Sequence, residues 1–451
     1  MPAPVPDHCH PRSHRHDLLT IRLAVVFAIE VRLSYPQIAC LLALLSELLT
    51  VAAPAFSTVR LWLLRLGLAA LRFAACTVAG GWTLVIDHTL GRGTRECLVV
   101  LGIPTATLLA RGQFRLSLAD MTAVHIEVMD GSNGDKVAAV LRPLLEKLER
   151  VNQVVCDQGS DLLRGVRLLD KDYPGIVLTY DVRHLCAALL RGWLRDCPRW
   201  GEFVRLCGQA AHRVRQTLGS FLAPPALRDK ARYMNLETHI NWAEQLLGWC
   251  VAPDWEGLAG ALNRTPEQAQ QWYNERFAWL EGFGADVRSW SGMLRAADLA
   301  VDEVQRFGLR RQTACRFWLR WRQTGPTADF QAQRYAGQIR AGLLEQGSKL
   351  KAGEVVLGSS DVIESLFGKY KEVMGRGPEK EVTANALLMA LMCGPGLSNE
   401  RIKAGLEQVS TEKLSEWMAE QFGQSDRAKK RDLFGDLPPQ RPRPPADPKR
   451  A

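Results

Sequence analysis

The sequence contains no pair of cysteines spaced Cys-x-x-Cys, although it has eleven cysteines among its 451 residues. The cysteines lie instead in apolar runs such as VVCDQG and RHLCAALL, where a reduced thiol behaves as a small hydrophobic side chain. This usage argues against a disulfide framework and favours a reducing compartment. We therefore expect a cytoplasmic protein.

Long uncharged apolar runs are also absent. Residues 18–80 are strongly apolar, but charged residues interrupt them so often that no window of about twenty residues is uncharged, which argues against a membrane-spanning helix. The first residues are rich in Pro and His rather than basic and then apolar, so we expect no signal peptide. The interrupting residues are Arg22, Glu30, Arg32, Glu47, Arg60, Arg65 and Arg72.

Acidic residues are outnumbered by basic ones. The chain has 57 Lys and Arg against 48 Asp and Glu, a formal net charge of +9 and a pI of about 9.1. A basic surface attracts phosphates and releases their counterions, so this balance suits a polyanion such as DNA. A basic enzyme without such a partner would have the same balance. The length predicts two or three domains.

The chain shows no internal repeat, and shifts in composition divide it instead. Pro-rich stretches at both ends, with like charges at the C-terminal end, favour disorder there. The expected segments are 1–16, a disordered tail; 17–79, a helical domain; 80–184, the first part of a core with strands; 185–353, a helical region; 354–423, the second part of the core with C-terminal helices; and 424–451, a disordered basic tail.

The first of these segments contains a group of possible metal ligands. They could bind a metal ion, but the Pro-rich tail around them offers no packed scaffold, so we prefer the interpretation as a disordered tail. The residues are His8, Cys9, His10, His14 and His16.

The second segment has the start signals of short helices. Ser34 is a potential cap with Pro36 in the first turn, and Ser57 or Thr58 could cap a later helix. Short helices joined by tight turns resemble a helix-turn-helix, which would bind DNA. A plain helical bundle is the alternative, because few polar side chains other than arginines are present to contact bases.

The block from residue 82 contains the strands. Three apolar runs come first, followed by an amphipathic segment, a strand, a second helical segment and a last strand. We expect the first three strands to form an antiparallel meander and the later two to run parallel to the first, as in a ribonuclease-H-like α/β fold. The runs are WTLVIDHT, ECLVVLGIP, VHIEVMD, GDKVAAVLRPLLEKLER, VNQVVCDQGSD, SDLLRGVRLL and GIVLTYDVRH.

Two carboxylates follow strands of this block. Asp87 and Asp157 each lie at the C-terminal end of an apolar strand, and the expected fold would place these strands side by side. Carboxylates brought close together repel each other unless a cation neutralises them, and Mg²⁺ prefers oxygen ligands. Either residue alone is also typical of a turn or a helix cap.

A third acid is expected from a later helix that begins after Ser359 or Ser360. Asp361, Glu364 and Lys371 share one face of this helix, because they are spaced by three and seven residues. The stripe thus presents two acids and a cation beside an apolar face. A solvated face with ordinary charge pairs is the alternative.

Four short motifs, IDHT, CDQGSD, DVRHL and SSDVIESLFGKYK, together resemble the catalytic domain of bacterial insertion-sequence transposases of the Asp-Asp-Glu type. The resemblance covers residues 82–184 and 354–393. It implies that Asp87, Asp157 and Glu364 are the catalytic acids and that they hold two Mg²⁺ ions, with Mn²⁺ as a substitute.

The resemblance also accounts for the long separation of the last two acids, 364 − 157 = 207 residues. Some cut-and-paste transposases carry an insertion domain at this junction, and here it would be the helical region. In one such group a Lys follows the Glu by seven residues, which is the position of Lys371. The Tyr and Arg found upstream of the Glu in that group are replaced here by Leu357 and Ser360.

Several further residues are expected near the site or on DNA. Asp181 and His184 end the last strand, where His184 could touch a phosphate or merely pack while Asp181 caps a helix; we expect supporting roles for both and for Asp361. The helical region holds ten of the thirteen Trp residues, most of them expected in its core. The candidate DNA contacts are Lys369, Lys371, Arg376, Arg60, Arg65, Arg316 and Arg320.

The implied function is transposition. Water would hydrolyse a phosphodiester at the transposon end, and the freed 3′-OH would attack the target DNA. The partners would be transposon-end and target DNA, bound by a homodimer or larger oligomer close to the nucleoid, with no membrane. A structure-specific nuclease that cuts without joining, or an inactive DNA-binding relative, would share these motifs.

Overall fold

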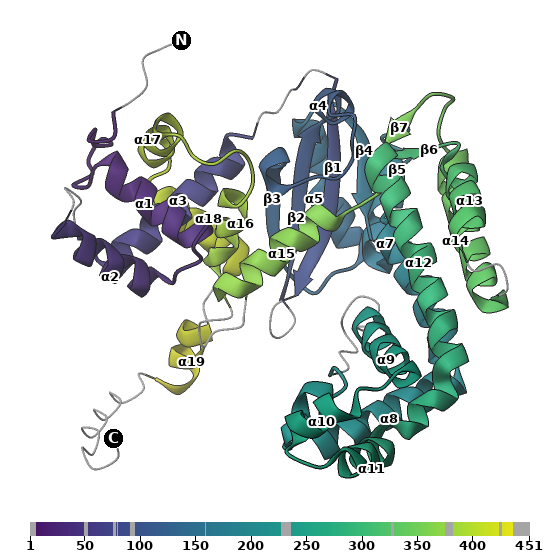
Figure 1. Ribbon diagram of the computed structural model, residues 1–451. Coiled ribbons are helices and arrows are strands. Elements are labelled where there is room, and N and C mark those ends of the chain that lie inside the picture. Colours follow the sequence, from purple (N-terminus) through teal and green to yellow (C-terminus); the bar gives the residue numbers. More distant parts are fainter. Residues whose placement is uncertain are drawn as a thin grey trace, which may run out of the picture.

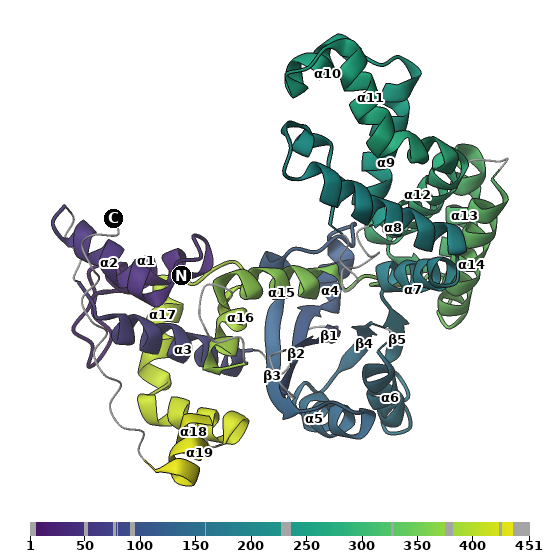
Figure 2. The same cartoon turned by 90° about the horizontal axis from the view of Figure 1, so that it is seen from below.

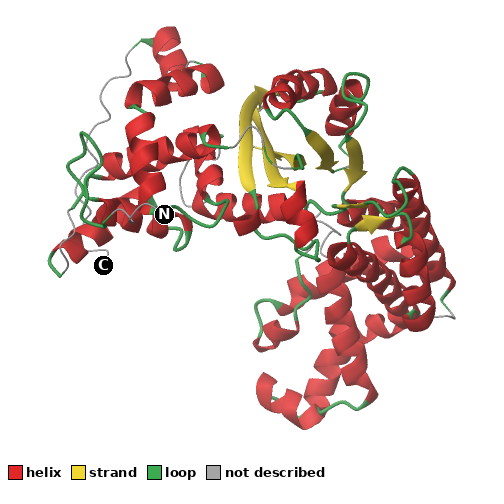
Figure 3. Ribbon diagram, turned by 90° about the horizontal axis from the view of Figure 1, so that it is seen from above, coloured by secondary structure: helices red, strands yellow, loops and turns green. Residues whose placement is uncertain are grey.

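A computed structural model describes residues 6–48, 53–74, 78, 80–90, 95–157, 159–226, 236–325, 329–374, 382–423 and 426–435. Five of the described strands form a central sheet with helices around it, and a large group of helices projects from one side (Figure 3). Within the described ranges, no helix combines the length and the hydropathy needed to cross a membrane.

The central sheet has five strands in the order β3-β2-β1-β4-β5. β1, β2 and β3 pair antiparallel, whereas β4 and β5 run parallel to β1, as the sequence predicted. This mixed α/β arrangement is compatible with a ribonuclease-H-like core (Figure 1). The bounds are β1 Trp82–Leu90, β2 Arg95–Pro104, β3 Thr122–Asp130, β4 Val151–Cys156 and β5 Val177–Tyr180.

Both faces of the sheet are covered, so its strands are apolar on both sides. Alternate residues of β1 point to opposite faces: Val85 packs toward α15 (Asp361–Met374), and Ile86 packs toward α5 (Gly134–Lys147) and α6 (Ser160–Leu169). Burying each such side chain contributes roughly 1.5–3 kcal/mol. Figure 2 shows α15 on one side of the sheet and α5 and α6 on the other.

The N-terminal and C-terminal helices form one unit beside the sheet. They share a single hydrophobic cluster with α15, and Gly67 of α3 lies so close to the Leu387 carbonyl that a Cβ there would be 2.4 Å away. The elements are α1 Leu18–Ile29, α2 Tyr35–Ser46, α3 Phe56–Arg72, η5 Ala384–Leu387, α16 Leu388–Leu391, α17 Asn399–Gln408 and α18 Thr411–Phe422.

The chain between β5 and α15 forms a separate helical region with its own aromatic core. Trp200 and Trp290 meet edge to face at 5.1 Å, and both are buried. A short pair of strands, β6 (Leu309–Arg310) and β7 (Val355–Val356), joins its end. Its helices are α7 Val182–Arg195, α8 Pro198–Val214, η2 Leu218–Leu222, α9 Leu236–Val251, α10 Trp255–Leu262, α11 Pro266–Phe277, η4 Ala278–Phe283, α12 Gly284–Phe307, α13 Thr313–Thr324 and α14 Phe330–Ser348.

The segments expected to be loose tails differ from that expectation where they are described. In residues 6–16, Arg12 donates its backbone N–H to Glu407 at 2.9 Å, and the neighbouring His16 ring meets Trp62 edge-on at 5.0 Å. In residues 424–451, Asp426–Phe434 form α19, and residues 436–451 lie outside the described ranges. The remaining short elements are α4 Thr105–Ala110 and η1 Leu118–Asp120.

Candidate active site at the ends of strands β1 and β4

The register of β1 and β4 places Asp87 beside Asp157. These parallel strands pair through Ile86 and Cys156, and each carboxylate is the next residue along. Paired strands lie about 4.8 Å apart, so the two carboxylates start from neighbouring backbone positions. Asp87 is two residues beyond Val85 and therefore faces α15, and the same alternation after Val155 directs Asp157 there.

Local hydrogen bonds hold both carboxylates. An Oδ1 of Asp87 accepts the backbone N–H of His88 at 2.7 Å, and Oδ1 of Asp157 accepts that of Gly159 at 2.8 Å. A Cβ at position 159 would lie 2.8 Å from the same oxygen, so a larger residue there would push the Asp157 carboxylate away from this position. Both Asp side chains are half-buried, which leaves oxygen atoms accessible to a ligand.

Asp181 ties together the three segments that meet at this edge of the sheet. Its buried carboxylate accepts hydrogen bonds from the N–H and the hydroxyl of Ser360, both at 2.6 Å, and from the N–H of His184 at 2.9 Å. Its own N–H donates to the Cys156 carbonyl at 3.1 Å. The end of β4, the start of α7 and the residue before α15 are thereby fixed relative to one another.

Glu364 lies at the start of the anchored helix α15 and is half-buried. Its Oε1 is 3.7 Å from Nε2 of His184, whose Nδ1 is 3.8 Å from Asp181. His184 thus lies between the buried Asp181 and Glu364. Asp361 pairs with Arg183 at 2.9 Å and accepts a hydrogen bond from Gln305, so it helps to hold the start of α15.

The candidate DNA contacts of α15 and α3 have different surroundings. Lys371 is exposed and Lys369 is half-buried on α15, and Arg60 is half-buried on α3. Arg65 donates to the carbonyls of Leu406 and Val409 at the end of α17, the latter at 2.6 Å, where a cation stabilises the helix terminus. Burial lowers the pKa of Arg65. Arg376 lies outside the described residues.

Two other candidate DNA contacts, Arg316 and Arg320, form ion pairs within the helical region. Nε of Arg316 is 2.5 Å from the buried carboxylate of Glu303, and Arg320 bridges Glu303 at 3.1 Å and Asp302 at 2.8 Å. A buried carboxylate requires such partners, because its desolvation is otherwise uncompensated. The arrangement matches a helix with an aromatic core face, since Phe317 and Trp321 are fully buried beneath these arginines.

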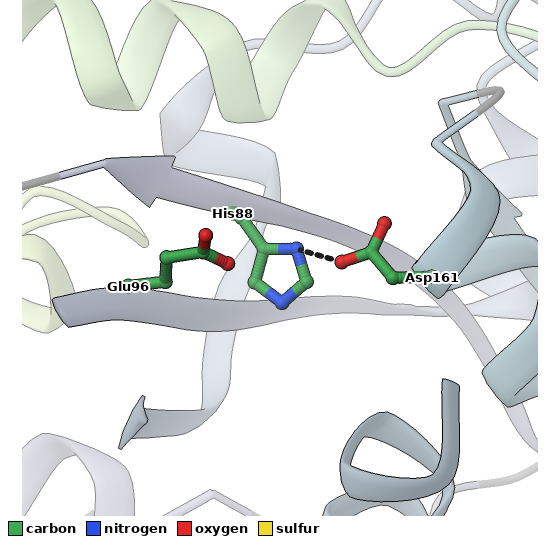
Figure 4. A group of neighbouring side chains, drawn as sticks. All are labelled: His88, Glu96 and Asp161. Atoms are coloured by element: carbon green, nitrogen blue, oxygen red, sulfur yellow. Dashed lines mark ion pairs between the residues drawn. The ribbon is translucent and has the colours of Figure 1, made fainter. Parts of the chain in front are cut away.

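Sequence reasoning missed a second polar cluster, which lies on the opposite face of β1. His88 of β1, Glu96 of β2 and Asp161 of α6 offer ligand atoms that all lie within 4.8 Å of one another (Figure 4). Burial lowers the pKa of His88 against the opposing effect of Asp161. Burial by itself would raise the pKa of Asp161, but the Ser132 hydrogen bond and His88 outweigh it and lower that pKa. Strand alternation predicts that His88 points to this face, but no pattern in the neighbouring sequence indicates that Glu96 and Asp161 lie beside it.

Comparisons with known proteins give little. No protein-family model matches the chain, and no curated protein matches it. Among solved structures, the Drosophila P element transposase strand transfer complex is similar over 80% of this chain and 86% of that chain, with 12% sequence identity and a TM-score of 0.36. A likeness at this level assigns neither fold nor function. A functional assignment therefore depends on the residues of the site.

Proposed function

We propose that the protein is a transposase of the Asp-Asp-Glu type, which cleaves DNA at transposon ends and joins them to target DNA. The observation that carries this proposal is the in-register placement of Asp87 and Asp157 at the ends of paired parallel strands, facing a helix that begins with an anchored Glu364. Carboxylates on one side of a sheet suit phosphodiester chemistry that depends on divalent cations. Among the described residues, the ligand atoms of Asp87, Asp157 and Glu364 do not form a group within 4.8 Å of one another, so the proposal requires Glu364 to move toward the two aspartates when ions bind.

The donor set fits Mg²⁺. Asp87, Asp157 and Glu364 provide hard oxygen atoms and are only half-buried, so water could complete the coordination that this ion prefers. Asp87 and Asp157 would hold the two ions jointly, and Glu364 would complete the second position. When bound, the ions would stabilise the attacking and leaving oxygens, and Mn²⁺ could replace them.

The other residues of the site would position these acids and the DNA. His184, 3.7 Å from Glu364 and 3.8 Å from the buried Asp181, would help to orient Glu364, while the Gly159 N–H holds Asp157. Lys371, seven residues along α15 from Glu364, is exposed and could contact a DNA phosphate. In the N-terminal helices, DNA contacts would be left to Arg60 and the ends of α3, because most of α3 is buried.

In this proposal, residues 185–353 are an insertion within one catalytic unit. The two junctions meet: the N–H of Val182 donates to the Gly358 carbonyl at 2.9 Å, and the Gln153 side chain of β4 bonds both the N–H and the carbonyl of Leu357. The aromatic core of the helical region is separate from the two clusters that cover the sheet. Two DNA ends must be held together, so we expect a dimer or larger assembly on DNA.

The test is a cleavage assay with a plasmid that carries the genomic flanks of the reading frame, in Mg²⁺ and in Mn²⁺. We expect Asp87→Asn, Asp157→Asn and Glu364→Gln each to abolish cleavage while DNA binding persists. Asp170→Asn at the exposed end of α6 and Glu372→Gln on the exposed side of α15 are matched controls and should cleave normally. Retained cleavage in any of the first three variants would remove that residue from the site.

A strand-transfer assay with a pre-cleaved end then separates a transposase from a nuclease. A transposase joins the free 3′-OH of this end to a target plasmid, whereas a nuclease with the same carboxylates only cuts. Cleavage without joining would therefore support the carboxylates as the catalytic site but overturn the assignment as a transposase.

A further inference from the structure

The second polar cluster, on the face of β1 opposite Asp87, contains one side chain from each of three elements. His88 comes from β1, Glu96 from the adjacent β2, and Asp161 from α6, which packs over this face. Nδ1 of His88 is 3.3 Å from Oδ2 of Asp161, and Figure 4 shows the Glu96 carboxylate on the other side of the imidazole ring. Residues far apart along the chain thus meet around one imidazole.

A fourth residue restrains the cluster. The Ser132 hydroxyl donates to Oδ2 of Asp161 at 2.5 Å and lies 3.4 Å from Nε2 of His88. The short contact commits the hydroxyl proton to Asp161, so Ser132 is not arranged as a nucleophile activated by His88. A hydroxyl in this place instead orients a carboxylate, which is the usual role of a residue next to a metal ligand.

We propose that His88, Glu96 and Asp161 bind one divalent transition-metal ion, with Zn²⁺ the best fit. One imidazole nitrogen and two carboxylate oxygens are donors that zinc accepts, and imidazole favours such ions over Mg²⁺. Ligands of a tetrahedral zinc lie about 3.4 Å apart, so the present spread of up to 4.8 Å needs a modest inward movement, which the long Glu96 side chain can supply.

This site shares no residue with the proposed magnesium site, but it adjoins that site at Asp157, because a Cβ on Gly159 would lie 2.8 Å from Oδ1 of Asp157 and 3.1 Å from Oδ1 of Asp161. Asp87 and His88 are consecutive residues of one strand and therefore point to opposite faces of the sheet. An ion held by His88 would cross-link β1, β2 and α6, and α6 follows directly after the turn that contains Asp157. The ion would thereby stiffen the strand ends that carry Asp87 and Asp157.

A simple histidine–carboxylate pair is the competing explanation, and the protein contains one for comparison. On strand β3, next to β2, Nε2 of His125 lies 3.2 Å from Glu127, and the His125 side chain is more exposed than that of His88, 33% against 9%. That pair is not among the groups of three possible ligands in the described part of the chain. His125→Ala is therefore a matched control for a histidine that pairs without binding an ion.

The experiment uses the full-length protein, treated with chelator and then dialysed against limiting Zn²⁺ in a large excess of Mg²⁺, which occupies the proposed magnesium site, with bound zinc counted by mass spectrometry. We expect Glu96→Gln and Asp161→Asn each to lose one zinc per chain, and Ser132→Ala to weaken affinity about tenfold or more. His125→Ala and Asp87→Asn should retain the wild-type zinc content. Cobalt in place of zinc should give a visible absorption band that the first two variants lack.

Thermal unfolding provides a second readout that needs no DNA. Zn²⁺ should raise the melting temperature of the wild type and of Asp87→Asn, but not that of Glu96→Gln. Unchanged zinc content in both Glu96→Gln and Asp161→Asn would overturn the proposal, as would zinc binding that requires Asp87. Because none of these measurements involves cleavage, the zinc site can fail while the proposed function stands, and the reverse.

Discussion

Acidic side chains have opposite surroundings in the sheet and in the helical region. At the ends of β1 and β4, Asp87 and Asp157 lie beside each other on neighbouring strands. In the helical region, Glu303 lies between two arginines, Arg316 and Arg320. Adjacent carboxylates destabilise a protein unless a cation binds, whereas a buried carboxylate between arginines is already neutralised. The contrast suggests that the strand ends serve a ligand and the helical charges serve the fold.

The largest difference should appear in the reaction rate. Asp157→Asn should lower the cleavage rate by about a thousandfold or more, because the lost cation interaction amounts to several kcal/mol in the transition state. The same change should leave the melting temperature equal or raise it, since it relieves repulsion with Asp87. A clear loss of stability would mean that Asp157 serves the fold, as Glu303 does, and would break the comparison.

Asp181 stabilises the fold and also positions residues of the site. Its replacement should therefore have an intermediate effect on the cleavage rate. Asp181→Asn replaces one carboxylate oxygen with an NH2 group, so either Ser360 or His184 loses its acceptor, and the change should cost about 1–3 kcal/mol of stability. Displacement of Glu364 should lower the cleavage rate about ten- to a hundredfold.

Measuring DNA affinity distinguishes the role of Asp181 in the fold from its role in positioning Glu364. The dissociation constant for DNA should stay unchanged, since Asp181 is buried and acts by positioning Glu364. A fall in DNA affinity equal to the fall in rate would mean general misfolding rather than displacement of one acid.

Glu303→Gln should affect stability and leave chemistry alone. The substitution removes the carboxylate that neutralises Arg316 and leaves Arg320 with Asp302 alone. We expect a loss of about 1–3 kcal/mol in the free energy of unfolding, because both arginines retain some solvent access. Denaturant titration measures this loss. A cleavage rate that falls while stability holds would place Glu303 in the reaction instead.

The smallest effect concerns contacts with DNA. Binding to end DNA should weaken with salt, and Lys371→Ala should reduce the slope of log affinity against log salt by about one phosphate contact. Arg316→Ala should leave this slope unchanged, because Glu303 already occupies that guanidinium. Lys147→Ala, exposed at the end of α5 on the other face of the sheet, is the control. Equal slopes for Lys371→Ala and Lys147→Ala would remove Lys371 from the DNA surface.

Much of the sheet could be predicted, because its signals are local. Apolar runs with β-branched residues predicted all five strands, and the meander followed by parallel strands is present in the structure. The roles of Asp87, Asp157 and Glu364 remain predictions that the cleavage variants test. The sequence also predicted arginines for DNA, which stays a prediction. It gave no sign that Arg65 donates to the carbonyl of Val409 at the end of α17, more than three hundred residues away in the chain.

What the sequence determined by itself follows from short-range periodicity. In WTLVIDHTL, alternation along a strand is enough to send Asp87 to one face of the sheet and His88 to the other. The Ser359–Ser360 pair before an apolar stripe is enough to start a helix that carries Glu364.

Only the tertiary structure decided which partners these side chains meet. Asp181 binds Ser360 across 179 residues of chain, and His88 meets Asp161 because α6 packs over β1. Periodic patterns depend on neighbours within a few residues, whereas an ion pair or a ligand set depends on how distant segments pack. For that reason the strands and helices are encoded locally, but the second cluster of ligands exists only once the whole sheet and its helices have come together.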